Sequence, residues 1–280
     1  MRGGWAGSLV VCALLGGAAR PAHATPPRDG FLAPARPGNY AHLDAFTVGT
    51  QLGLENRADL EPGMSQLSTR AAGLISLPYA DGSMNLDARV AVLTVGASAG
   101  YRWVYRNLDF DAGQPRSYEA RSERESAGEM DTMGFGYAEG RVRLALPLDS
   151  FFLLSTLTRR FEDRRADTFD WYHADIHGGG WLTKEETVLL YRHRSFGAVG
   201  PLVRYMNVPK DGGRHDELHA GLVFMTRPGL VRPKHHDSDL VLAQVVGQPG
   251  GSFLNPEYGL QGWHVPLYVM LVYRATLALE

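Results

Sequence analysis

From about residue 41 to the end of the chain, apolar and polar side chains alternate with a period of two. This period is typical of β-strands, in which successive side chains point to opposite faces. The alternation is clearest in segments where every second residue is apolar: Leu67, Ala71, Ile75 and Leu77; Met84, Leu86, Ala88, Val90 and Val92; Tyr101, Trp103 and Tyr105; Leu218, Ala220, Leu222 and Phe224; and Leu267, Val269, Leu271, Tyr273, Leu277 and Leu279.

The positions between these apolar residues hold arginine, glycine and small polar residues. The segments are also long, about 10 to 14 residues, whereas strands of soluble proteins average about five or six. Long strands with aromatic residues near their ends and charges on the other face are typical of transmembrane β-barrels. The pattern therefore predicts an all-β fold, a transmembrane antiparallel up-and-down barrel.

The strand count depends on residues 84–108. Taking this range as one strand gives ten strands, with the longer connections at 56–63, 109–132, 162–182, 209–214 and 247–256 on one side. The short turns at 78–83, 147–150, 197–200 and 227–237 then lie on the other side. Twelve strands remain possible, because residues 257–280 contain Pro266 and have room for two strands.

The N-terminal residues predict export. Arg2 is followed by an apolar stretch over residues 8–17 and by Ala22-His23-Ala24, which together are typical of a cleaved signal peptide over residues 1–24. Residues 25–40 are rich in proline and form a predicted periplasmic leader, and residues 41–280 form the barrel domain. No later stretch approaches the roughly 20 apolar residues that a transmembrane helix requires.

Composition narrows the possible partners. Hydrophobic residues make up 44% of the chain and charged residues 21%, which excludes a disordered protein. Without Arg2 and Arg20, 26 basic and 30 acidic residues remain, a net charge of −4 that gives no electrostatic support to a nucleic-acid partner. The only cysteine, Cys12, lies in the predicted signal peptide, so the mature chain has no thiol.

The cleavable signal, proline-rich leader, alternating segments and aromatic-containing final strand resemble those of bacterial outer-membrane β-barrel proteins over residues 41–280. The resemblance implies a location in the outer membrane, with membrane lipids and the barrel-assembly machinery as partners. One departure is the end of the chain, Leu279-Glu280, where such proteins commonly finish on an aromatic residue. Oligomeric state is not indicated.

One constellation fits nucleophilic catalysis. His193 and Ser195 are two residues apart on a predicted strand and therefore point the same way, and Asn207 on the next strand is placed to orient the imidazole. This arrangement resembles that of outer-membrane phospholipase A, and the lipid A 3-O-deacylase family also uses a His-x-Ser pair. Here residues 196–201 replace the phospholipase's Asn-Gly and its calcium-binding loop.

Two groups of histidines are candidate metal ligands: His173 and His177 near Asp170 and Asp175, and His235-His236-Asp237. Their spacings match no closed site, so we predict no metal and no cofactor. The predicted lumen-facing set consists mainly of arginines: Arg70, Arg89, Arg102, Arg106, Arg141, Arg143, Glu217 and Arg274.

The lumen-facing charges are consistent with a channel lining or with a narrow interior filled by paired side chains. The leading interpretation is a non-enzymatic outer-membrane barrel with a structural or narrow-channel role. Two alternatives stay open: an outer-membrane lipid acyl hydrolase that uses His193, Ser195 and Asn207, and a soluble periplasmic barrel or sandwich that binds a ligand.

Overall fold

The computed structural model describes residues 36–47, 49–62, 64–110, 123–170, 175–193, 197–210, 213–227, 239–247 and 267–279. These residues belong to a unit that spans Ala35–Glu280. The predicted signal peptide and most of the predicted leader lie outside the described residues, and the first strand begins at Gly38, inside the predicted leader.

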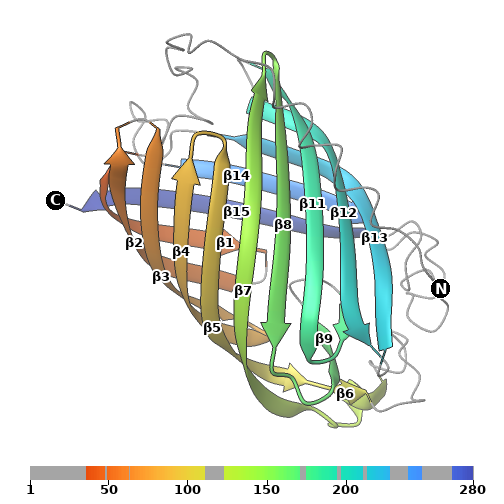
Figure 1. Cartoon of the computed structure of the whole chain (residues 1–280). Coiled ribbons are helices and arrows are strands. Elements are labelled where there is room, and N and C mark those ends of the chain that lie inside the picture. The colour runs from red at the N-terminus through yellow and green to blue at the C-terminus, as the bar shows by residue number, and fades with distance from the viewer. Residues whose placement is uncertain are drawn as a thin grey trace. The chain divides into compact units, whose positions relative to one another are not determined.

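Twelve antiparallel strands close into one barrel (Figure 1). The strands neighbour one another in the order β1-β15-β14-β13-β12-β11-β8-β7-β5-β4-β3-β2, so the last strand pairs with the first. Their bounds are β1 Gly38–Phe46, β2 Gly49–Glu61, β3 Ser65–Ser76, β4 Tyr79–Val90, β5 Leu93–Asn107, β7 Asp131–Leu148, β8 Phe151–Glu162, β11 Gly180–His193, β12 Gly197–Lys210, β13 Gly213–Thr226, β14 Asp239–Gly247 and β15 Leu267–Leu279.

A second, three-stranded sheet is built from short segments between the barrel strands. It contains β6 (Asp109–Phe110), β9 (Asp167–Asp170) and β10 (Asp175–His177). We call the end of the barrel that holds the start of β1 and the end of β15 the terminal end, and the other the loop end. The small sheet is at the loop end, away from the turn between β7 and β8 (Figure 1).

The predicted barrel is confirmed, with twelve strands, the larger of the two counts considered. The extra strands arise where the ten-strand scheme continued a strand through a turn. Residues 84–108 are split by a turn at Ala91–Val92, and the first segment is split between the end of β1 at Phe46 and the start of β2 at Gly49. The final segment, in contrast, contributes one strand in its described part.

The additional turns change the sides of the first two connections. The connection predicted at 56–63 lies at the terminal end, and the connection predicted at 78–83 lies at the loop end. From β5 onward the predicted sides agree with the structure, and the long connections after β5 and β8 are both at the loop end.

Two tight turns at the terminal end contain a residue with positive φ. Ala91 (φ 50°) joins β4 to β5, and Asp149 (φ 55°) joins β7 to β8. An arginine binds the carbonyl of each: Arg89 Nε donates to Ala91 O at 3.1 Å, and Arg192 donates to Asp149 O. Since side chains seldom favour positive φ, these bonds help to hold the two turns.

In a closed barrel, one alternating set of side chains faces inward and the other outward. The outward set is largely apolar and exposed, with exposed fractions of 64% for Leu52, 70% for Ile75 and 62% for Met84. The inward set is more buried and includes Asp44, with an exposed fraction of 0%. No helix in the described part of the chain has the length and apolar character needed to cross a membrane.

Candidate functional site: the barrel interior and the outer face

The interior has two chemically different walls. The inward positions of β1 to β5 and of β7 are mostly polar or charged, with one small buried apolar cluster of Tyr79, Val104 and Phe135. The inward positions of β8 and of β11 to β14 also carry many buried apolar side chains: Phe152, Leu182, Val188, Leu190, Ala198, Leu202, Met206, Val208, Val223 and Val246. The alternation in the sequence predicts a polar lumen, and this apolar wall does not follow from it.

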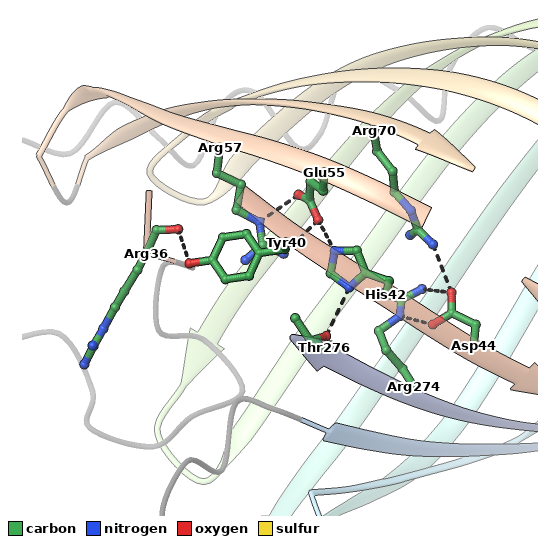
Figure 2. Close-up of polar contacts among 9 residues, drawn as sticks. All are labelled: Arg36, Tyr40, His42, Asp44, Glu55, Arg57, Arg70, Arg274 and Thr276. Atoms are coloured by element: carbon green, nitrogen blue, oxygen red, sulfur yellow. Dashed lines mark hydrogen bonds and ion pairs between the residues drawn. The ribbon is translucent and has the colours of Figure 1, made fainter. Parts of the chain in front are cut away.

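Asp44 is the centre of the first charged cluster (Figure 2). It accepts two hydrogen bonds from Arg274, from Nε at 2.6 Å and from Nη2 at 2.8 Å, and one from Arg70 Nη2 at 3.0 Å. These residues come from β1, β15 and β3, so one carboxylate links strands on both sides of β1. Charge-assisted bonds of this bidentate kind are the strong ones.

His42 lies two residues before Asp44 on the same face of β1. Its Nε2 is 2.6 Å from Glu55 Oε2, and its Nδ1 is 3.1 Å from Thr276 Oγ1 (Figure 2). Glu55 also accepts hydrogen bonds from Arg57 Nε at 2.7 Å and Nη2 at 2.9 Å. The His42 side chain is only 2% exposed.

A hydroxyl, an imidazole and a carboxylate in this order are the groups of a nucleophilic triad. Here the carboxylate is shared with the Arg57 guanidinium, and the imidazole is 2% exposed and lies beside the Tyr40 ring, with 6.4 Å between the ring centroids. The arrangement is therefore best suited to cross-linking β15, β1 and β2.

A second charged network begins on β4 and β5. Arg102 Nε donates to Asp81 Oδ2 at 2.9 Å, and the Tyr137 hydroxyl donates to Asp81 Oδ1 at 2.8 Å. Nearer the terminal end, Arg141 of β7 donates to both oxygens of Asp87, at 3.0 and 2.6 Å. Each carboxylate thus bridges two strands that are not direct neighbours, since β5 lies between β4 and β7.

This network continues toward the loop end through alternating charges. Glu139 is 3.6 Å from Arg141 and 3.8 Å from Arg160, and Arg160 Nε is 2.7 Å from Glu162. Glu162 also pairs with Arg164, which lies beyond the end of β8. The inner face of β7 and β8 is therefore followed lengthwise by a ladder of ion pairs.

The small sheet is joined to the loop end of this ladder. Arg164 Nη1 donates to Thr168 Oγ1 of β9 at 2.8 Å, and its guanidinium is 4.3 Å from the centroid of the Phe135 ring. Gly178, next to β10, donates its backbone N–H to Pro209 O of β12 at 2.9 Å. Close by, Lys210 Nζ and Glu217 Oε1 are 3.4 Å apart, and both side chains have exposed fractions of 0%.

The predicted lumen-facing residues occupy three kinds of position. Arg70, Arg102, Arg141, Glu217 and Arg274 take part in the ion pairs described above.

Of the other three, Arg89 binds a turn carbonyl, whereas Arg106 and Arg143 have exposed side chains. For Arg106 the reason is a register shift between Val104 and Asn107, which interrupts the alternation at the end of β5.

The structure does not bring the predicted catalytic residues together. His193 pairs with Gly197 at the terminal end of β11, whereas Asn207 pairs with Thr183, ten residues away on the same strand. At about 3.3 Å per residue the two are about 33 Å apart along the strand. Asn207 instead bonds Asp216 Oδ1 at 2.6 Å and Arg214 Nε at 2.5 Å, and Ser195 lies outside the described residues.

The candidate metal ligands that the structure describes do not form a metal site. Among the described residues, no three His, Cys, Asp or Glu side chains gather as possible ligands. His177 is buried, with Nδ1 3.1 Å from Gly178 O. His173 and residues 235–237 lie outside the described residues.

The predicted lumen-facing set does not include His42, Asp44, Glu55 and Arg57, which the structure places inside the barrel. The signal available was a spacing of two between opposite or complementary charges, in His42 and Asp44 and again in Glu55 and Arg57. Spacing by two places both members on one face of a strand. It does not tell which residue of the neighbouring strand they meet.

Two pairs of aromatic rings mark the outer face of β8 and β11. Phe161 and Trp181 have ring centroids 5.5 Å apart toward the loop end, and Phe151 and Tyr191 have the same separation toward the terminal end. The pairs are ten residues apart on each strand. At about 3.4 Å per residue and a tilt of about 35–45°, this corresponds to about 24–28 Å along the barrel axis.

The apolar band of outer-membrane barrels is about 25 Å tall and is bounded by such aromatic girdles. The chain has the architecture of an outer-membrane β-barrel. Its exterior places leucine, valine and aromatic residues where a soluble barrel would place charges, with Leu222 59% and Val269 60% exposed.

Comparison with known proteins adds fold neighbours. No protein-family model matches the chain, and no curated protein sequence matches it. Similar solved structures include LpxR from Salmonella typhimurium (9% identity, 86% of this chain and 99% of that chain, TM-score 0.38) and the NanC porin (7%, 87% and 100%, TM-score 0.35). CdiB from Acinetobacter baumannii is also similar (9%, 85% and 46%, TM-score 0.43).

Proposed function

We propose that this protein is an integral β-barrel of the bacterial outer membrane, with a structural or narrow-channel role. The observation that carries the proposal is the division of side chains between the two faces of a closed barrel. Exposed apolar residues cover the outside between two aromatic girdles, and the charged residues inside are paired with one another. Lipids of the outer membrane are then the direct partners of the outer face.

The paired interior supports low permeability. Asp44, Asp81 and Asp87 each hold one or two arginines, and these arginines point inward from β3, β5, β7 and β15. A guanidinium held bidentately by a buried carboxylate is costly to displace, because separation leaves both charges unpaired. Any passage is therefore narrowed by these side chains.

The two alternative functions have less support. An acyl hydrolase that uses His193 and Asn207 requires residues that lie at opposite ends of β11 and β12 to meet. A soluble ligand-binding barrel encloses its apolar face, whereas Leu52, Ile75 and Leu222 are exposed on this barrel.

Purified protein tests the proposal. It should require detergent to stay in solution, and it should migrate faster on a gel before heating than after, as folded outer-membrane barrels do. Depletion of the barrel-assembly machinery should reduce the fast-migrating form in cells. A protein that stays soluble without detergent and shows no heat-dependent shift would refute the membrane assignment.

Conductance across a planar lipid bilayer tests the narrow interior. We expect small or no steps for the parent protein, and larger steps after Arg141→Ala and Arg160→Ala are combined, since this removes two guanidiniums from the β7–β8 ladder. Arg106→Ala, which changes an exposed arginine near the end of β5 and outside the ladder, serves as the matched control. Large steps in the parent protein would contradict a narrow interior.

A further inference from the structure

We propose that the outer face of β8 and β11 binds a second copy of this chain through Arg159 and Glu185. The proposal rests on the membrane position proposed above. It starts from a difference between this face and the outer face of β3, β4 and β5. The outward positions of β3, β4 and β5, from Leu67 to Tyr105, carry no charged side chain, whereas β8 and β11 each place one on the outer face between the two aromatic girdles.

Both side chains are exposed and lie inside the apolar band. Arg159 is two residues from Phe161, and Glu185 is four residues from Trp181 and six from Tyr191. Four residues correspond to about 10 Å along the axis of a tilted strand, so Glu185 lies well below the girdle. Charged groups on the lipid face of a barrel are destabilising, and increasingly so toward the middle of the bilayer.

Within the described part of this copy, neither charge has an oppositely charged partner. Arg159 lies over the Trp181 ring, 5.0 Å from its centroid, but among the described residues it forms no ion pair, and neither does Glu185. By contrast the nearby hydroxyls of Ser155 and Thr187 are 3.0 Å apart and bond each other. The unsatisfied groups on this face are thus one positive and one negative charge.

The two charges are placed to complement a second copy. Arg159 is directly opposite Thr183, and Glu185 is opposite Leu157, so the two are diagonal neighbours with about 7–8 Å between them. A two-fold axis along the membrane normal brings this patch against itself, because an isologous interface uses the same surface on both subunits. Arg159 of each copy then faces Glu185 of the other, and both pairs leave the lipid.

Cysteine cross-linking in membranes tests the interface, because the predicted mature chain has no cysteine. Thr183→Cys, between the two charges, should form a disulfide between copies under mild oxidation. Leu52→Cys, exposed on β2 at the other side of the barrel, is the control and should remain a monomer. Equal cross-linking of the two variants would overturn the proposal.

Charge reversal tests the pairing itself. Glu185→Arg should weaken dimerisation in nanodiscs at least about thirtyfold, the effect expected when one partner of a desolvated charge pair is lost. The double variant Arg159→Glu with Glu185→Arg should restore it, since the reciprocal pairs form again with reversed sign. A double variant as monomeric as the single one, or a parent protein that is monomeric, would refute the reciprocal pairs.

The heat-dependent gel shift of the same samples separates the two proposals. Loss of the fast-migrating form in the parent protein refutes the membrane barrel itself. A normal shift together with a monomeric parent protein refutes only the pairing of copies.

Discussion

Replacing Asp44 by asparagine should destabilise the barrel more than any equivalent change at the polar wall. The side chain is completely buried and receives three hydrogen bonds from Arg70 and Arg274. Asparagine keeps the shape and one acceptor but removes the negative charge. Two guanidiniums then remain close together with no carboxylate between them.

The size of the expected stability loss depends on how deeply Asp44 and its two arginine partners are buried. Breaking a buried pair by removing one member costs about 3–5 kcal/mol, because the remaining charge is left uncompensated. The Arg70 side chain is 19% exposed and the Arg274 side chain 37%, so water screens part of the repulsion. We therefore expect a loss of about 3 kcal/mol in the free energy of unfolding, measured by urea titration in lipid vesicles with the gel shift as the readout.

Asp87→Asn is the matched control. Asp87 binds one arginine, Arg141, and its side chain is 27% exposed, so the same substitution should cost about 1 kcal/mol. Adding Arg70→Met to Asp44→Asn should recover part of the loss, since it removes one of the two unpaired charges. Equal losses for the two aspartate variants would refute the idea that burial of the Asp44 carboxylate determines how strongly it stabilises the barrel.

Three further changes follow from the packing inside the barrel. Phe135→Ala, which removes a ring that is 1% exposed, should cost about 3–5 kcal/mol in the same titration. Lys210→Met should cost about 3–5 kcal/mol, because it removes the cation that lies 3.4 Å from the fully buried Glu217 carboxylate. Gly200→Ala should prevent assembly of the fast-migrating form, since a Cβ there would lie 1.8 Å from Leu189 O, whereas Gly73→Ala, with open space around it, should assemble normally.

The barrel itself was predictable because each strand is read independently from its period. The number of strands was harder to predict. One signal in the sequence, a change in the phase of the alternation, indicates the twelve strands that the structure has. The outward apolar residues are even-numbered from Met84 to Val90 and odd-numbered from Leu93 to Tyr105. A continuous strand cannot exchange its faces in this way, so the change of phase marks the turn at Ala91–Val92.

The charged network was only partly predictable. Inward arginines such as Arg141 and Arg274 follow from alternation, but their partners come from strands that are not adjacent in sequence. Asp44 and Arg274 are 230 residues apart and meet only because β1 and β15 close the barrel. Register and closure are properties of the whole sheet, and no local pattern contains them.

The apolar inner wall is the feature that sequence reasoning was least able to find. On β11 both faces carry apolar residues, with Leu182, Val188 and Leu190 inside and Leu189 outside. Lipid solvates the outward side chains before and after the barrel forms, so their contribution to packing is small compared with a core that excludes both lipid and water. The close-packed residues of β8 to β14 therefore form the larger apolar core among the described strands, whereas the inner side of β15 through β1 to β7 combines ion pairs with one small apolar cluster around Tyr79, Val104 and Phe135. Dispersion between packed side chains is local, so a substitution among the apolar residues of β8 to β14 should weaken mainly its own contacts. Ion-pair networks are cooperative, so removal of one charge from β15, β1 or the strands up to β7 should also weaken the neighbouring pairs.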